Sequence, residues 1–488
     1  MIKRDIEILI LLTGFNNMTE DWKNTIKIPY GAWDEDKELC LSVPASWNIH
    51  VLEPANGPEI DNHEIEDAFN NPIGTSSVQK MAIGKRSVAI AVDDITRPTP
   101  TARILPILIN ELRKSGLKES DITIIIGTGA HRPMNQSEVS KKLGEEIVTK
   151  YKVRMHDFSG QDIRYFGWVK GGPVYLNSHF LDADLRICIG CVMGNNNMGF
   201  GGGAKMIVPG LAGHLTIAHF HGVLPDRPKG QMEAQSGILD KRIWAEQVAQ
   251  QVGIDLVVCT VLNSRRQLAG IYVGDVVKAH RMAAKLALQI GETIVSKNAI
   301  QNADIVIVNS YPLDNAPMLM DQAISITKEL SPKCVVAIDA ASDGVFYHGM
   351  GGGLGIDVKK IVKHFGLWLY HPEKIWIWLK SIKTAFKSPF HIVSLTIYTF
   401  NYWTYEEYQK EKHSFIEHPS HPEIDSNFLL YSKNFPEWAF RRWRFRKKNN
   451  CRLFRDWGDL IRSLSQKCKK KFEVLVIPCA PVQFLKIY

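Results

Sequence analysis

Short runs of apolar, largely β-branched residues recur along the chain, and most of them end at a glycine, aspartate or asparagine. Apolar runs without polar alternation are typical of strands that are buried on both faces of a parallel sheet. We therefore expect strands within residues 87–94, 122–129, 185–190, 254–263, 303–310 and 334–340.

The segments between these runs carry apolar residues at helical spacing. The clearest are residues 101–117, in which Pro106 should introduce a kink, and residues 273–290, which a glycine follows. Alternating strands and helices predict an α/β fold. We expect two domains with mostly parallel sheets flanked by helices, and an active-site cleft between them.

A new strand–helix series begins at Ala303, which places a domain boundary near residues 290–300. We predict an N-terminal cofactor-binding domain at 25–292 and a C-terminal α/β domain with an aromatic-rich insertion at 293–470. Residues 471–488 are expected to form a closing strand that returns to one of the sheets, with the first domain as the suggested destination.

The composition is that of a soluble globular protein, with 45% apolar and 23% charged residues among 488. The formal net charge of +8 is concentrated in part at RRWRFRKK, residues 441–448. Such a run could contact nucleic acid or anionic lipid. A solvated helix face whose aromatic side chains pack inward is the preferred interpretation, so neither a nucleic-acid nor a membrane partner is predicted.

No segment has the length of a membrane-spanning helix, about 18 or more uncharged apolar residues. The nearest, residues 388–403, is too short and contains His391. The apolar start of the chain resembles a signal peptide but is interrupted by Asp5 and Glu7. Eight scattered cysteines indicate a reduced, cytoplasmic protein. The one CxxC, from Cys188 to Cys191, has no second pair for a zinc site, so a packing role is favoured over a metal or redox role.

Polar residues stand where the predicted strands end, which is the edge at which open α/β sheets bind ligands. The first strand is followed by DDITRPTP, residues 93–100, which offers carboxylates, a hydroxyl and a guanidinium before a helix. This set suits an anion or nucleotide, although helix capping by Asp94 or Thr96 is an equal alternative. The second strand is followed by His131 after two glycines, where a histidine is a candidate base near neutral pH.

The third strand leads into MGNNNMGFGGGAKMIVPG, residues 193–210. A lysine after glycines suggests a phosphate-binding loop, but that motif needs Ser or Thr directly after the lysine, and Met206 follows Lys205. The glycines allow a ligand to lie against the backbone, with Lys205 placed to contact it or to bond with it.

Three motifs in this order, DDITRPTP, GTGAHRPM and the glycine loop with Lys205 and His221, resemble the lactate racemase family. KIPYGAW at 27–33 and NSYPLD at 309–314 extend the resemblance, which is clear over residues 25–345. The family's enzymes interconvert 2-hydroxy acids by reversible hydride transfer and use a nickel-pincer nucleotide, pyridinium-3,5-bisthiocarboxylic acid mononucleotide nickel. The resemblance therefore implies an isomerase with a small-molecule 2-hydroxy acid substrate, which depends on cofactor-synthesis enzymes.

The resemblance also implies roles for individual residues. Lys205 matches the lysine that bonds covalently to the cofactor, and His221, sixteen residues later, matches the nickel ligand. Imidazole and sulfur donors suit square-planar nickel(II). Asp94, Ile95, Thr96 and Arg97 match the family's cofactor-contacting segment, His131 matches one catalytic base, and Gln322 matches a substrate-binding glutamine.

Two positions depart from the family pattern. Asn195 stands where a second catalytic histidine is expected, and an asparagine does not act as a base at neutral pH. Ser325 stands where a substrate-binding lysine is expected, and Lys328 is out of register. A racemase or epimerase acting on a hydroxy acid other than lactate, with His131 and Asn195 at its catalytic centre, is the first hypothesis.

Two other hypotheses stay open. One is a redox or elimination enzyme that uses the same cofactor and needs only one base. The other is a degenerate member that binds a ligand without chemistry, although the retained lysine and His221 argue against it.

Overall fold

The computed structural model describes residues 24–34, 36–158, 160–222, 239–343, 427–435, 437, 440, 451–465 and 471–488. The side chains of His214, Ala218, His221 and Met318 also lie outside this description. Residues 1–23, the apolar segment 388–403 and the basic run 441–448 are among the sequence features that fall outside it.

The first of two large sheets has six strands in the order β13-β12-β9-β4-β5-β6, parallel except for the β12–β13 pair. The strands are β4 (Val88–Asp93), β5 (Ile122–Gly127), β6 (Lys152–Met155), β9 (Leu185–Cys191), β12 (Leu256–Leu262) and β13 (Leu268–Gly274). All six residues of β4 are buried, as expected for a strand covered on both faces. The strands predicted at residues 87–94, 122–129, 185–190 and 254–263 are therefore confirmed.

Helices cover both faces of this sheet. One face packs on α2 (Asn62–Asn70), α3 (Val78–Ala82), α4 (Thr101–Arg113), α5 (Gln136–Leu143) and α6 (Glu145–Lys150). The other face packs on α7 (Ser178–Leu181), α8 (His214–Gly222), α10 (Asp240–Val252) and α11 (Lys278–Gly291). Of the two predicted helices, α4 runs through Pro106, and α11 begins only after β13 has ended at Gly274.

The second large sheet has the order β18-β17-β16-β15-β19-β3, and every neighbouring pair is parallel. Its strands are β3 (Asn48–Val51), β15 (Ile305–Asn309), β16 (Cys334–Ile338), β17 (Asn427–Tyr431), β18 (Cys451–Phe454) and β19 (Glu473–Ile477). One face packs on α12 (Lys297–Asn302), α13 (Met320–Ile324) and α14 (Thr327–Leu330). The other packs on α19 (Trp457–Ser465) and on the hairpin of β1 (Asn24–Tyr30) and β2 (Lys37–Val43).

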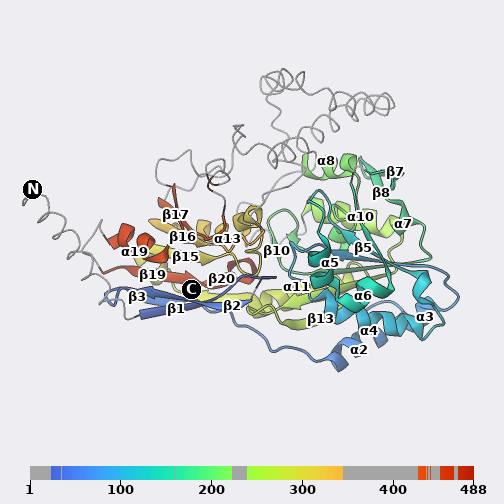
Figure 1. Cartoon of the computed structure of the whole chain (residues 1–488), viewed down its shortest axis with the longest axis horizontal. Coiled ribbons are helices and arrows are strands. Elements are labelled where there is room, and N and C mark those ends of the chain that lie inside the picture. The colour runs from blue at the N-terminus through green and yellow to red at the C-terminus, as the bar shows by residue number, and fades with distance from the viewer. Residues whose placement is uncertain are drawn as a thin grey trace, which may run out of the picture.

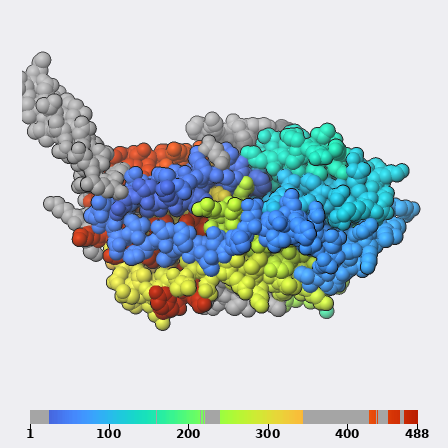
Figure 2. Space-filling view, turned by 90° about the horizontal axis from the view of Figure 1, so that it is seen from below, coloured from blue at the N-terminus to red at the C-terminus, as the bar shows by residue number. Residues whose placement is uncertain are grey.

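The α/β fold with parallel sheets flanked by helices is confirmed, and Figure 1 shows the two sheets at opposite ends of the molecule. The second sheet takes strands from each of the three predicted segments, 25–292, 293–470 and 471–488. β3 comes from the N-terminal part yet joins the second sheet, beside β19 from the C-terminal part. Figure 2 shows the same arrangement, with blue atoms beside yellow and red ones at one end. The division into domains stays a prediction.

Short elements complete the structure. Three two-stranded sheets are formed by β7 (Ile163–Val169) with β8 (Gly172–Asn177), β10 (Gly194–Asn195) with β11 (Gly199–Phe200), and β14 (Glu292–Val295) with β20 (Phe484–Ile487). Single 3-10 turns are η1 (Glu119–Asp121), η2 (Gly203–Met206), η3 (Pro317–Leu319) and η5 (Ala480–Val482). Among the described helices, none has the length and apolar character needed to cross a membrane.

Candidate active site

The candidate site lies at the carboxyl ends of three neighbouring strands. β9, β4 and β5 are adjacent in the first sheet, so the segments that follow them meet at one edge. Residues 93–100 begin at the last residue of β4, His131 follows β5, and the glycine loop follows β9. This is the edge at which open parallel sheets bind ligands.

Asp94 and His131 form a largely buried carboxylate–imidazole pair at this edge. The distance between Asp94 Oδ2 and His131 Nδ1 is 2.6 Å, and the two side chains are 4% and 16% exposed. Burial by itself raises the pKa of Asp94, but the facing His131, Arg97 and Thr96 outweigh it and hold that pKa below the ordinary value of 3.8. Asp94 is therefore ionised at neutral pH, and Nδ1 donates its proton to the carboxylate.

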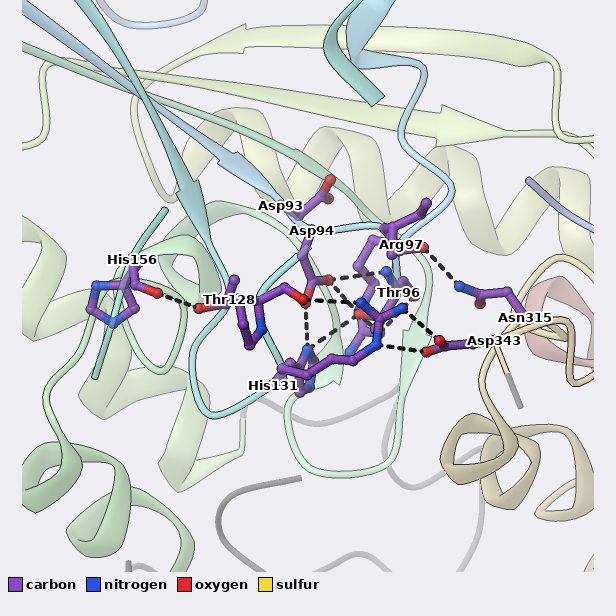
Figure 3. Close-up of polar contacts among 12 residues, drawn as sticks. Asp93, Asp94, Thr96, Arg97, Thr128, His131, His156, Asn315 and Asp343 are labelled. Carbon is purple, nitrogen blue, oxygen red and sulfur yellow. Dashed lines mark hydrogen bonds and ion pairs between the residues drawn. The ribbon is translucent and has the colours of Figure 1, made fainter. Parts of the chain in front are cut away.

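The turn after β4 holds Asp94 in place. The backbone N–H of Thr96 and its hydroxyl both donate to Asp94 Oδ1, at 3.1 and 2.5 Å. Arg97 donates from Nη1 to the carbonyl and hydroxyl oxygens of Thr96, at 2.9 and 3.1 Å. The carbonyl of Ile95 accepts from the amide of Asn315 at 3.1 Å. Figure 3 shows these side chains converging beside His131.

A buried ion pair between Asp93 and Lys142 supports the turn and was missed by sequence reasoning. Lys142 Nζ lies 2.7 Å from Asp93 Oδ1, its side chain is fully buried, and it donates to the carbonyl of Arg97 at 2.8 Å. Asp93 Oδ2 accepts from the hydroxyl of Thr99 and the backbone N–H of Cys191. The pair thus joins the ends of β4 and β9 to the turn, and the one sequence signal for it is the Asp93–Asp94 doublet.

Arg132, next to His131, links the two large sheets. It contacts Asp343, which lies beyond the end of β16, with Nε–Oδ2 at 3.1 Å and Nη2–Oδ1 at 2.5 Å. It also forms a bidentate ion pair with Glu138 at 2.9 and 2.6 Å. Because these two carboxylates engage its guanidinium on both sides, Arg132 is a structural bridge beside His131.

Lys205 lies on η2, directly after the glycine loop. Its side chain keeps partial solvent access, yet its amine lies deep in the protein and has no hydrogen bond or ion pair with a described residue. Burial is the largest cause that lowers the pKa of Lys205 well below its ordinary value, and the positive charges of Arg97 and Arg242 lower it further. Asp94 and Asp93 raise the pKa of Lys205 without offsetting these effects. Lowering the pKa of a lysine favours its use as a nucleophile.

Asn195 and Gln322 both contact the hairpin formed by β10 and β11. Asn195 Oδ1 accepts from the backbone N–H groups of Asn197 and Met198, at 3.2 and 3.1 Å. Gln322, on α13, donates its amide to the carbonyl of Gly194. The oxygen of Asn195 is thus occupied, which leaves its amide nitrogen as the donor for a ligand.

The other residues singled out by sequence fall into different surroundings. Ser325 is buried and donates to the carbonyl of Gln322, while Lys328 is exposed on α14. Cys188 and Cys191 lie in β9 with their thiols in the two opposite cores, consistent with packing. Among the described residues there is no cluster of three or more metal-ligating side chains.

Two histidines, His219 and His221, lie near the end of α8. His221, the predicted nickel ligand, lies on the helix, and its side chain is outside the described part of the chain. His219 is 9% exposed, and its ring lies against Gly172 and against Trp244 at a centroid distance of 5.0 Å. Burial lowers the pKa of His219.

Residues 35–233 match the model of a protein family described as the lactate racemase N-terminal domain. Two curated relatives carry the name lactate racemase. The protein from Thermoanaerobacterium thermosaccharolyticum is 30% identical over 300 residues, which cover 59% of this chain and 67% of the relative. The protein from Lactiplantibacillus plantarum is 29% identical over 305 residues, which cover 59% and 69%.

Two solved structures share the fold. The lactate racemase apoprotein of Thermoanaerobacterium thermosaccharolyticum superposes with a TM-score of 0.61 at 20% identity, covering 95% of this chain and 100% of that one. A Thermotoga maritima protein superposes with a TM-score of 0.51 at 15% identity, covering 88% and 100%.

Proposed function

Because this chain belongs to the lactate racemase family, we propose that it is a nickel-pincer nucleotide-dependent racemase or epimerase of a 2-hydroxy acid other than lactate. The observation that carries the proposal is the Asp94–His131 pair, which lies at the sheet edge from which the loop of Lys205 also starts. A cytoplasmic location and dependence on cofactor-synthesis enzymes belong to the same proposal.

The surroundings of Lys205 support its assignment as the residue that would bond to the cofactor. A tethering lysine must be neutral, and the buried amine of Lys205 has no carboxylate partner in the described chain. The turn from Asp94 to Arg97 would contact the nucleotide, and Arg97 uses only Nη1 for contacts within that turn. His221 would be the nickel ligand. When bound, the pyridinium ring of the cofactor would accept and return the hydride.

The chain's own part in the chemistry is proton transfer and orientation. Nδ1 of His131 donates to Asp94, so Nε2 is the nitrogen that would take the substrate hydroxyl proton and return it. Asp94 holds the ring in this tautomer and stabilises its charged form. On the other substrate face, the amide nitrogen of Asn195 would donate to a hydroxyl or carboxylate group.

One observation keeps a one-sided redox or elimination reaction as the second candidate. Such a reaction needs a single base, and the oxygen of Asn195 is engaged by its own loop. The two candidates differ in the product. Racemisation or epimerisation returns the hydroxy acid with inverted configuration. Elimination releases water and an unsaturated acid, and a redox reaction releases a keto acid and passes the hydride to a second, carbonyl-containing substrate.

The intact mass of protein produced together with the cofactor-synthesis enzymes tests the proposal. An adduct of nucleotide size on the Lys205 peptide, with nickel in proportion, is the expected result. Protein that remains unmodified under these conditions would contradict the proposal.

Replacing His221 with alanine is expected to abolish nickel binding while the mass adduct on Lys205 remains. Imidazole is one of four proposed metal ligands and takes no part in the covalent bond to Lys205. The variant should therefore lose nickel and keep the adduct. Metal analysis and intact mass of the same preparation give both numbers. His219→Ala is the matched control on the same helix and should keep its nickel. Stoichiometric zinc or iron in place of nickel would show that the ligand assignment is wrong.

Replacing Asn195 with histidine is expected to raise racemisation of lactate above that of the unmodified protein, because it restores a base on the second face. General-base assistance contributes about 10²- to 10⁴-fold, and loss of the contacts from Asn195 Oδ1 should reduce the gain. Chiral chromatography of either enantiomer measures the rate. Asn197→His, which adds an imidazole at another place in the same loop, should show no gain. Brisk racemisation by the unmodified protein that is lost in His219→Ala would instead place the second base at His219.

A further inference from the structure

Two buried side chains from helices α10 and α11 donate hydrogen bonds to the glycine loop, at residues 200–202. Arg242, on α10, is 2% exposed and donates to the carbonyls of three successive loop residues, Phe200, Gly201 and Gly202. His280, on α11, is also 2% exposed, and its Nε2 lies 2.9 Å from the carbonyl of Gly201. The glycine loop is therefore held by two helices, α10 and α11, which lie on one face of the first sheet.

The network fixes the hydrogen-bonding state of His280. Arg281 donates to His280 Nδ1 at 2.9 Å, so Nδ1 is an acceptor and Nε2 must carry the proton that it donates to Gly201. Burial and the charge of Arg242 both lower the pKa of His280, which keeps the ring neutral. Glu246 holds Arg281 by two contacts of 2.8 Å and lies 3.9 Å from Arg242 Nε.

The loop fits tightly between this network and the end of β9. A Cβ atom at Gly203 would lie 3.0 Å from His280 Cδ2, and one at Gly202 would lie 2.7 Å from Val192 Cγ2. Both glycines have positive φ, 68° at Gly202 and 55° at Gly203, which L side chains rarely adopt. The backbone of η2 thus has little room to shift.

A single carbonyl connects the network to Lys205. The oxygen of Gly202 accepts both from the backbone N–H of Lys205 at 3.1 Å and from Arg242 Nη1 at 3.2 Å. Arg242 therefore acts on the position of Lys205 through one shared acceptor. Its guanidinium is also one of the two positive charges that disfavour protonation of the Lys205 amine.

We propose that Arg242 and His280 are positioning residues, which hold the glycine loop and thereby fix the place of the Lys205 amine for tethering. The proposal rests on the proposed role of Lys205. A loop that needed only packing would not require a buried guanidinium, because removing this charge from water is unfavourable. Within the described chain, Arg242 Nε also has no hydrogen-bond partner, so the site bears this cost without full compensation.

Reductive methylation of the apoprotein with formaldehyde and cyanoborohydride, followed by peptide mass spectrometry, reports on Lys205 independently of activity. In Arg242→Met, the pH profile of Lys205 labelling should move to higher pH, because a neighbouring positive charge is lost. In Arg242→Lys, which keeps the charge but loses the fork to three carbonyls, the labelling profile should stay near that of the unmodified protein. Arg186→Met is the matched control, since Arg186 also donates to four carbonyls but at the start of β9, away from the loop.

Attachment of the nucleotide in cells that make the cofactor gives the second readout. Both Arg242 variants should acquire the adduct about ten- to a hundredfold more slowly, as misplacement of a reacting group predicts. His280→Gln, which keeps a donor for Gly201, should be less impaired than His280→Leu. Unchanged labelling and attachment in Arg242→Met, or losses of equal size in Arg186→Met, would overturn the proposal. If the unmodified protein itself takes no adduct, the proposed function fails, and the labelling profiles still decide whether Arg242 controls Lys205.

Discussion

Replacing Lys205 with alanine should abolish the nucleotide adduct completely, and with it all turnover. No other described lysine combines a position at this sheet edge with a deep, unpartnered amine. Lys142, the other buried lysine at this edge, is held in an ion pair with Asp93. Intact mass spectrometry of variant and unmodified protein, each produced with the cofactor-synthesis enzymes, measures the effect directly.

Lys205→Arg replaces the nucleophilic amine with a guanidinium of similar length. A guanidinium stays protonated and does not form the tether, so this variant should also lack the adduct. Lys328→Ala is the matched control, because that lysine is exposed on α14 and should be dispensable. An adduct that persists in Lys205→Ala at another residue would contradict the assignment.

Replacing His131 with alanine should reduce turnover of the true substrate by about 10²- to 10⁴-fold while the Lys205 adduct and its nickel remain. The loss should appear in kcat, since the imidazole moves a proton and the cofactor is held by other residues. Steady-state kinetics on cofactor-loaded protein is the measurement. Equal kcat in variant and unmodified protein would remove His131 from the mechanism.

Asp94→Asn tests the orientation of the same ring. An amide in place of the carboxylate favours the wrong tautomer of His131, so kcat should fall although the shape is nearly unchanged. In the unmodified protein the lowered pKa of Asp94 stabilises the fold at pH above the unfolded value of 3.8, and this contribution is lost as pH falls through the folded value. The Asp94–His131 pair therefore does not lose its negative charge in the neutral range, and Asp94 should not shape the pH profile of activity there.

The parts of the fold that were predictable from sequence are those set by local pattern. Apolar runs such as 87–94 and 303–310 became fully buried strands, because only a strand covered on both faces accommodates uninterrupted apolar residues. The rule that ligands bind at strand ends then identified the segments of Asp94, His131 and Lys205. Adjacency of β4, β5 and β9 in the sheet brings these segments to one edge.

Contacts between residues distant in sequence were not predictable in this way. Lys142 and Arg242 lie in helices whose charged residues would ordinarily face solvent, and no local pattern distinguishes a buried cation from an exposed one. Their partners, Asp93 and the loop carbonyls, lie on other elements. For the same reason the sequence did not show that β3 joins the second sheet, since a short, mostly exposed strand carries a weak signal.

The pairing of β3 with β19 has a consequence for the order of folding during synthesis. The first sheet is built from residues 88–274, a continuous stretch that is complete once its last strand has left the ribosome. The second sheet cannot close until residues 473–477 arrive to fill the place between β15 and β3, so the β1–β3 segment must wait for them. Domains generally fold as units in the order of their synthesis. The edge that carries the candidate site is therefore expected to form early, while the second sheet, linked to it by Arg132 and Asp343, forms last.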